Sequence, residues 1–150
     1  MKVFITGVGG FLGHHLAVRM HELGHEIEGN DTFVGGEEDN VPKFVKFHLI
    51  DCCDFNAMAK AMEGCDLLYH CAATAHEGLS VFSPSFITRN IFEASVTSFS
   101  AAISVGVKRI VFCTSMARYG NQKAPFTEDM QTAPVDPYGI AKVAAEEVLK

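Results

Sequence analysis

The stretch Thr6-Gly7-Val8-Gly9-Gly10-Phe11-Leu12-Gly13 decides the fold. It follows the apolar run Val3–Thr6, which predicts a strand, and it opens the amphipathic segment Phe11–Leu23, which predicts a helix. Its glycines recur at every third residue, at Gly7, Gly10 and Gly13. That spacing suits a tight turn, a close approach of backbone to a ligand, and close packing of a helix on a strand. We therefore predict a phosphate-binding turn at a helix N-terminus.

Strand-like and helix-like segments alternate through the rest of the chain. Apolar runs predict further strands at Glu26–Asn30, Phe44–Leu49, Leu67–Cys71 and Arg109–Thr114. Further helices are expected at Asn56–Met62, at Phe86–Val105 and from Pro137 to Lys150. This alternation predicts an α/β fold of the Rossmann type, a doubly wound parallel sheet with helices on both faces. Because five strands are visible and the last helix has no stop signal, we expect the fold to be truncated before its last strands.

The sequence of the first predicted helix indicates which of its faces packs on the sheet. Leu12, Leu16, Met20 and Leu23 are spaced by four, four and three residues, which predicts one apolar stripe facing the sheet. Gly24 follows at the position where helices commonly end.

Composition and charge exclude several classes of function. The chain has 150 residues, 48% of them hydrophobic and 20% charged, as in an ordinary globular domain. Its net charge is −6 and it has no block of basic residues, so neither nucleic acid nor a membrane surface is expected as a partner. With no long apolar run and no signal-peptide pattern, the protein is expected to be cytoplasmic.

The cysteines and histidines do not predict a metal site. Five cysteines, an odd number, favour free thiols, and Cys71 and Cys113 are expected to be small buried residues of strands. The adjacent His14 and His15 face different directions on a helix, whereas a catalytic metal needs about three protein ligands that converge.

Asp31 indicates which dinucleotide the glycine turn would hold. It lies 18 residues after Gly13, near the spacing of a carboxylate that binds a ribose 2′-hydroxyl. No Lys or Arg occurs between Arg19 and Lys43 to bind a 2′-phosphate, so NAD is favoured over NADP. The alternative is that Asp31 is only a solvated acid next to a loop. We expect the segments Thr32–Pro42 and Asn121–Pro137 to be surface loops.

Several motifs in this order resemble one family. The glycine turn is followed by His70-Cys71-Ala72-Ala73, by Thr114-Ser115 before Tyr119-Gly120, and by Tyr138-x-x-x-Lys142. Together they resemble the extended short-chain dehydrogenases/reductases, the NAD-dependent nucleotide-sugar epimerases and dehydratases. Met116 and Ala117 stand where dehydratases of the family carry an Asp-Glu pair, so dehydration is not expected. The chain is most similar to the hexose and hexuronate 4-epimerases of the family.

The resemblance implies a site, a cofactor and partners. The implied catalytic residues are Ser115, Tyr138 and Lys142. The implied NAD-binding residues are Gly7, Gly10, Phe11, Leu12, Gly13, Asp31, Asp51, Cys52, Cys71, Ala72, Ala73, Asn90, Tyr138 and Lys142. A nucleotide-sugar substrate and a homodimer built on the helices that carry Asn90 and Tyr138 are also expected.

The spacing of Tyr138 and Lys142 bears on the chemistry that they could carry out. Tyr138 and Lys142, at i and i+4, share one helix face. A tyrosine pKa of about 10 must fall by about 3 units for a base at neutral pH, which requires about 4 kcal/mol. We expect the charges of Lys142 and the oxidised cofactor to lower the pKa of Tyr138 by that amount. Tyr138 would then take the proton of a sugar hydroxyl that Ser115 orients, although Ser115 could instead only end a strand.

Two other functions stay open on the sequence. One is an NAD(P)-dependent nucleotide-sugar reductase or dehydrogenase, which would consume its cofactor as an epimerase does not. The other is a non-catalytic dinucleotide-binding module. In either case residues 1–150 are expected to form the NAD-binding domain, with the region that selects the substrate absent. We therefore expect little turnover from these residues alone.

Overall fold

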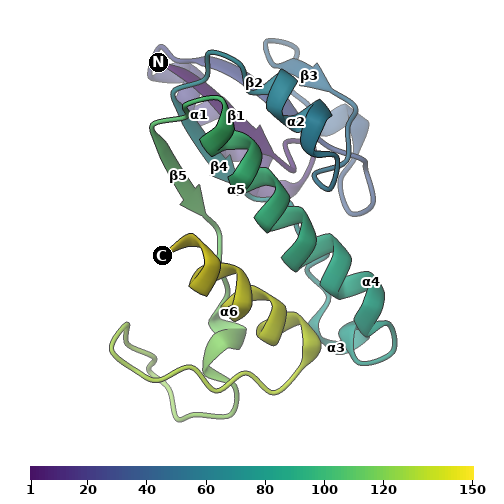
Figure 1. The fold of residues 1–150 in the computed structure, drawn as a ribbon, viewed down its shortest axis with the longest axis vertical. Coiled ribbons are helices and arrows are strands. Elements are labelled where there is room, and N and C mark those ends of the chain that lie inside the picture. Colours follow the sequence, from purple (N-terminus) through teal and green to yellow (C-terminus); the bar gives the residue numbers. More distant parts are fainter.

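One parallel sheet of five strands, with helices on both faces, organises residues 1–150, all of which the computed structural model describes (Figure 1). The strands are β1 (Lys2–Thr6), β2 (Glu26–Asn30), β3 (Lys46–His48), β4 (Leu67–His70) and β5 (Arg109–Phe112). Their order is β3-β2-β1-β4-β5, and each neighbouring pair is parallel. The predicted Rossmann-type α/β fold is confirmed.

β3 is shorter than the predicted strand Phe44–Leu49. The amide of Val45 donates to the carbonyl of Pro42 at 2.9 Å, so a turn occupies the first residues of that run. Pairing with β2 therefore begins only at Lys46, opposite Glu28. Val45 is still buried, because it joins the apolar cluster that includes Val3 of β1 and Ala17 of the first helix.

Most helices lie where the sequence predicts them. α1 (Phe11–Glu22), α2 (Phe55–Ala61) and α6 (Pro137–Leu149) match their predicted segments. The long predicted helix Phe86–Val105 is three consecutive segments, α4 (Pro84–Thr88), the π turn η2 (Arg89–Glu93) and α5 (Ala94–Ser104). Three short segments were not predicted: η1 (Glu38–Asn40), α3 (Glu77–Ser80) and η3 (Met116–Tyr119). None of the helices combines the length and apolarity that a membrane span requires.

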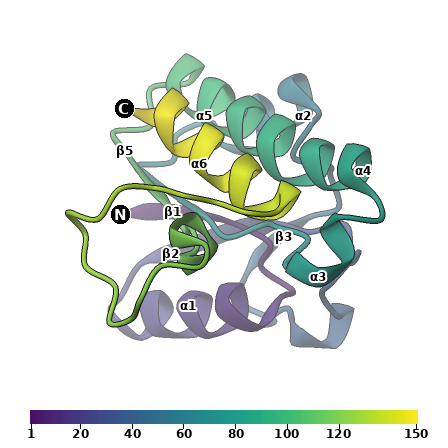
Figure 2. The same ribbon diagram turned by 90° about the horizontal axis from the view of Figure 1, so that it is seen from below.

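The helices divide between the two faces of the sheet. α1 covers one face, and α2, α5 and α6 lie together on the other (Figure 2). β1 alternates accordingly: Val3 and Ile5 join the apolar cluster under α1, whereas Phe4 joins the cluster under α2 and α5. Both faces of the central strands are thus buried, as expected for a parallel sheet.

The predicted stripe of α1 is wrong at both ends. Leu12 and Leu23 are 51% and 54% exposed, and the buried face is instead Gly13, Ala17 and Met20. The cause is the close approach of the helix to the glycine turn: a Cβ on Gly13 would lie 2.1 Å from the carbonyl oxygen of Gly7. Gly13 and Ala17 are small enough to let the backbone of α1 approach the turn and the sheet, and Leu12 and Leu23 are left exposed. Gly24 ends the helix as predicted, with φ +82°.

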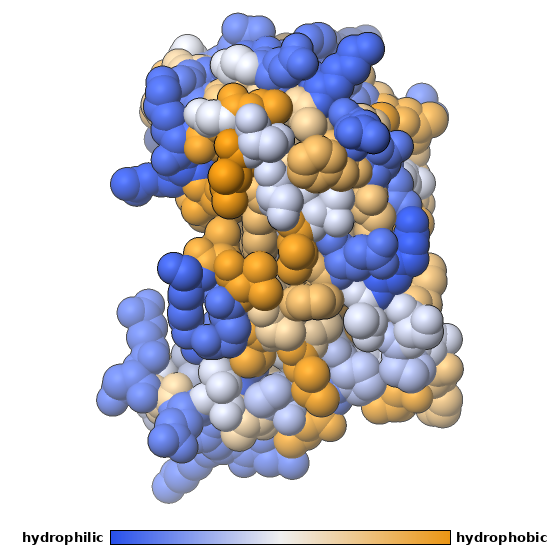
Figure 3. All heavy atoms as spheres, in the orientation of Figure 1, coloured by the Kyte–Doolittle hydropathy of each residue, from blue (hydrophilic) through white to orange (hydrophobic).

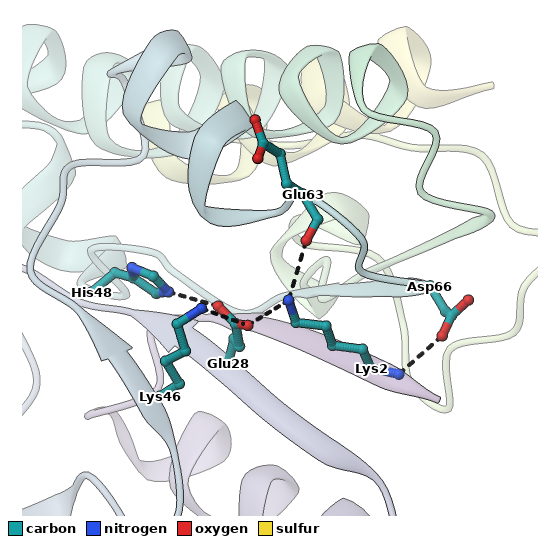
Figure 4. A network of polar contacts seen from close by, with 6 residues as sticks. All are labelled: Lys2, Glu28, Lys46, His48, Glu63 and Asp66. Atoms are coloured by element: carbon teal, nitrogen blue, oxygen red, sulfur yellow. Dashed lines mark hydrogen bonds and ion pairs between the residues drawn. The ribbon is translucent and has the colours of Figure 1, made fainter.

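A buried carboxylate ties the three strands at one side of the sheet together (Figure 4). Glu28 on β2 accepts from Lys2 at 2.5 Å, from Lys46 at 3.1 Å and from His48 at 2.8 Å. Burial by itself would raise the pKa of Glu28, but these hydrogen bonds outweigh it and hold the pKa below its ordinary value. The bond to Glu28 likewise raises the pKa of Lys2.

Candidate cofactor cavity and active site

A cavity opens at the carboxyl ends of β1 to β4, the edge where ligands bind in open α/β sheets. Each strand contributes the residues that follow it, because the chain turns there toward the next helix. The cavity brings together nine of the residues named from the sequence: Gly7, Gly10, Asp31, Asp51, Cys52, Cys71, Ala72, Ala73 and Asn90.

The glycine turn forms one wall of this cavity by close backbone contact. Gly7 has φ +70°, and a Cβ there would lie 2.9 Å from the backbone of Ala72. Gly10 is the N-cap of α1 and has no side chain to satisfy the first amides of the helix, which remain available to an anion. Phe11 and Leu12 contribute no side chain to the cavity, because both point outward. The turn therefore fits a pyrophosphate group.

Asp31 lies at the end of β2 with its carboxylate over the turn. Its two oxygens accept from the amides of Gly9 at 2.9 Å and Phe33 at 2.8 Å. A carboxylate has about four acceptor positions, so it can still accept from ribose hydroxyls. The residues that line the cavity include no Lys or Arg. A carboxylate acceptor with no cation in the lining suits a ribose diol, which donates hydrogen bonds, better than a 2′-phosphate, which is negatively charged.

Sequence reasoning missed part of the cavity wall. The segment after Asp31, taken as a surface loop, folds back over the turn and lines the cavity with Thr32, Val34, Gly35 and Gly36. The amide of Glu37 donates to the carbonyl of Gly9 at 3.0 Å. A Cβ on Gly36 would lie 2.8 Å from Gly9, so the Gly35-Gly36 pair was the signal of this close contact.

Asp51 and Asn90 lie on the far wall. Asp51 accepts from Arg89 at 2.9 Å and from the amide of Cys53 at 2.9 Å. Burial would raise the pKa of Asp51, but these two donors hold it below its ordinary value. Asn90 lies in the π turn and donates to the carbonyl of Phe86 at 2.8 Å. π turns within α-helices often occur at functional sites.

A buried chain of hydrogen bonds holds the end of β4, where Cys71 and Ala72 line the cavity. The Thr6 hydroxyl accepts from the amides of Cys71 and Ala72, both at 3.1 Å, so its one proton points to Nδ1 of His70 at 2.9 Å. His70 Nε2 must then donate to Ser95 Oγ at 3.0 Å, and Ser95 donates to the carbonyl of Ile91 at 2.5 Å. Burial, with a smaller effect from Lys142, lowers the pKa of His70 to about 3. His70 is thus a neutral support for the cavity wall.

Ser115 and Tyr138 meet through close packing of α6 on η3. Asp136 caps α6 by accepting from the amide of Gly139 at 2.8 Å. A Cβ on Gly139 would lie 2.9 Å from the carbonyl of Ala117, so the glycine lets the helix approach. This brings the buried hydroxyl of Tyr138 within hydrogen-bonding reach of Ser115. Tyr138 also packs with Ala73, which joins this group to the cavity.

Lys142 is buried one helical turn after Tyr138, as the spacing predicts, but its ammonium group does not act as expected. It donates to the carbonyl of Cys113 at 2.7 Å and lies 6.0 Å from the centre of the Tyr138 ring. Burial lowers the pKa of Lys142 to about 8. Burial also raises the pKa of Tyr138, and the hydrogen bond from Ser115 offsets this only in part. Lys142 is thus not among the groups that lower the pKa of Tyr138 here, and the combined effect predicted for Lys142 and the oxidised cofactor stays a prediction.

No three His, Cys, Asp or Glu side chains are grouped as a metal ion would need. Residues 3–150 match the model of the NAD dependent epimerase/dehydratase family. The chain belongs to this family.

Its relatives in the epimerase/dehydratase family include enzymes that act on nucleotide sugars. The chain is 30% identical to the UDP-glucose 4-epimerase of Streptomyces lividans, over 99% of this chain and 46% of that protein. It superposes with a TM-score of 0.94 on UDP-glucose 4-epimerase with UDP-glucose from Thermotoga maritima, at 28% identity over 99% of this chain and 50% of that one.

A second solved structure carries the cofactor of the family. The UDP-glucose 4-epimerase of Stenotrophomonas maltophila, with bound NAD and formylated UDP-arabinopyranose, gives a TM-score of 0.94 at 28% identity. The match covers 99% of this chain and 47% of that one. The chain spans about half the length of the curated relatives that it matches.

Proposed function

We propose that residues 1–150 form the NAD-binding domain of a nucleotide-sugar 4-epimerase. The observation that carries the proposal is the position of the Ser115, Tyr138 and Lys142 group beside the cavity built on the glycine turn. The 4-epimerase relatives and the NAD-bound neighbour support it.

The fit of NAD rests on particular residues. Its pyrophosphate would lie on the free amides at the start of α1, next to the turn in which Gly7 leaves no room for a Cβ against the backbone of Ala72. Asp31 would accept from a ribose diol. Asp51 and Asn90 would line the opposite wall. When bound, NAD supplies the reversible acceptor for the hydrogen removed from the sugar carbon.

The chain's own residues would manage the proton. Tyr138 would take the proton of the 4-hydroxyl at its phenolic oxygen and later return it, and Ser115 would orient that hydroxyl. Because burial raises the pKa of Tyr138, its basic form needs additional positive charge nearby or a higher pH. Lys142, fixed by the Cys113 carbonyl, would hold one such charge in the site.

The test separates the cofactor from the chemistry. NAD affinity is measured by calorimetry, and turnover is measured as conversion of UDP-glucose to its 4-epimer. In a protein that also carries the substrate-selecting region, Tyr138→Phe should abolish turnover and leave NAD affinity unchanged, whereas Tyr69→Phe, outside the group, should leave both unchanged. A Tyr138→Phe protein that keeps its turnover would refute the role of Tyr138. Stoichiometric consumption of NAD or NADH would favour a reductase instead.

Asp31 provides an independent check of the cofactor. Asp31→Asn removes a charged acceptor worth about 1.5–3 kcal/mol, so NAD affinity should fall by about tenfold to a hundredfold. Asp39→Asn makes the same change of charge at an exposed position of the same loop and should have no effect. Equal affinities of the wild-type protein for NAD and NADP would contradict the assignment.

We also propose that two copies associate through α5 and α6. The two helices lie side by side on the outer face, and Figure 3 shows hydrophobic residues along this face between hydrophilic margins. Ile103 of α5 and Ile140 and Val148 of α6 are 54–68% exposed, and Phe86 of the adjoining α4 is 48% exposed. Sedimentation should give a dimer that Ile103→Glu disrupts, and a monomeric wild-type protein would contradict the proposal.

A further inference from the structure

Two cysteines face each other where β4 and β5 end. His70 pairs with Phe112 in the ladder, so the next residues, Cys71 and Cys113, are directly opposite. The amide of Cys113 donates to the carbonyl of His70 at 3.1 Å, which keeps the strands together at this point. The two Sγ atoms are 3.6 Å apart, and both thiols are free and half-buried. Both were expected to be small buried residues of strands, but they are only half-buried and lie side by side just after the strands end.

The surroundings make one thiol of the pair more acidic than the other. A hydrogen bond between the two thiols lowers the pKa of Cys113, and the ammonium group of Lys142 adds to this against the opposing effect of burial. The same hydrogen bond, together with burial, raises the pKa of Cys71. Burial also raises the pKa of Cys53 to about 12 and that of Cys65 to about 11. Cys113 is thus the one cysteine of the chain whose surroundings favour the thiolate.

We propose that Cys71 and Cys113 are a redox modification site that closes to a reversible disulfide when the protein meets a peroxide or a small-molecule disulfide. The sulfurs must approach by about 1.5 Å to reach bonding distance, which small side-chain rotations on adjacent strands can supply. This inference does not depend on what the cavity binds.

The reaction with hydrogen peroxide balances without another reagent. The Cys113 thiolate attacks one peroxide oxygen, the O–O bond breaks, and a sulfenic acid and hydroxide form. The Cys71 sulfur then attacks the sulfenic sulfur, forming the S–S bond and releasing water. Two thiols lose two electrons and two protons in total, and the peroxide becomes two molecules of water. A reducing thiol reverses the change by disulfide exchange.

The bond would join two parts of the site covalently. Cys71 lines the cavity, and the neighbouring Ala72 packs against Gly7. The carbonyl of Cys113 holds the ammonium group of Lys142. Oxidation therefore fixes the cavity wall to the strand end that positions Lys142, and it removes the thiolate charge nearest to that ammonium group.

The experiment treats the purified protein with hydrogen peroxide and measures its intact mass and free thiols. The expected result is loss of two thiols and of two hydrogen atoms in mass, reversed by dithiothreitol, with fragmentation placing the bond between Cys71 and Cys113. Cys53→Ala and Cys65→Ala should still form it. Loss of no thiols, or a bond between other cysteines, would overturn the proposal.

Single variants test which thiol reacts first without requiring the bond to form. Cys71→Ala should give a sulfenic acid on Cys113 that dimedone traps, whereas Cys113→Ala should react at the slow rate of the other cysteines. Lys142→Met should slow the reaction of Cys113 by about threefold or more, because it removes the charge that favours the thiolate. Equal rates in the two cysteine variants would refute the assignment of Cys113.

Discussion

Replacing Thr6 by valine tests the buried chain that supports the cavity wall. Valine has nearly the shape of threonine but no hydroxyl, so packing is kept while the hydrogen bonds are lost. The Thr6 hydroxyl serves three groups, the amides of Cys71 and Ala72 and the Nδ1 atom of His70. Each group left without a partner costs about 1–3 kcal/mol. Because the two amides are only part-buried and can recruit water, we take the low end, about 3 kcal/mol in total.

The assay is urea unfolding of the wild-type protein and two variants. A loss of about 3 kcal/mol is a large part of the 5–15 kcal/mol that stabilises a typical domain. It corresponds to a fall in melting temperature of roughly 10 °C for a chain of this size. Thr6→Ser keeps the hydroxyl and loses one methyl group, so it should cost only about 1 kcal/mol. The explanation fails if the valine variant is as stable as the serine variant, or more stable.

Further predictions concern the glycine turn and acid stability. Gly13→Ala places a Cβ 2.1 Å from the Gly7 carbonyl and should lower both the melting temperature and NAD affinity, whereas Gly78→Ala, in open space, should change neither. On acidification the unfolded chain protonates His70 below about pH 6.5 while the folded chain, with its pKa at about 3, does not, so stability should fall from that pH downward. Glu28, whose folded pKa is lowered, should add a second loss below about pH 4, and only this second loss should be missing in Glu28→Gln. A loss of stability below about pH 4 that stays unchanged in Glu28→Gln would contradict the role of that carboxylate.

Features that depend on neighbours in sequence were predictable. The glycine turn, the five strands and the helix that carries Tyr138 each follow from a local pattern of apolar residues and turn residues. The residues that follow the strands were also grouped correctly around the cavity, because the carboxyl ends of parallel strands meet at one edge.

Features that depend on distant contacts were not predictable. The face that α1 buries is set by the backbone of Gly7 pressing on Gly13, which no helical periodicity encodes. The pKa of Tyr138 depends on how deeply α6 buries it and on which carbonyl holds Lys142. Pairing of Cys71 with Cys113 required the register of β4 and β5, which was unknown from the sequence.

The π turn at Arg89–Glu93 makes the site sensitive to the length of a single helix. Such a turn holds one residue more than the regular helix around it needs. Removing one residue there would restore the regular i→i−4 pairing and change which side chains of this segment face the cavity. Asn90, which lines the cavity from this turn, would then lose its present position. A one-residue deletion in this helix should therefore be far more harmful to the site than most substitutions of the same residues.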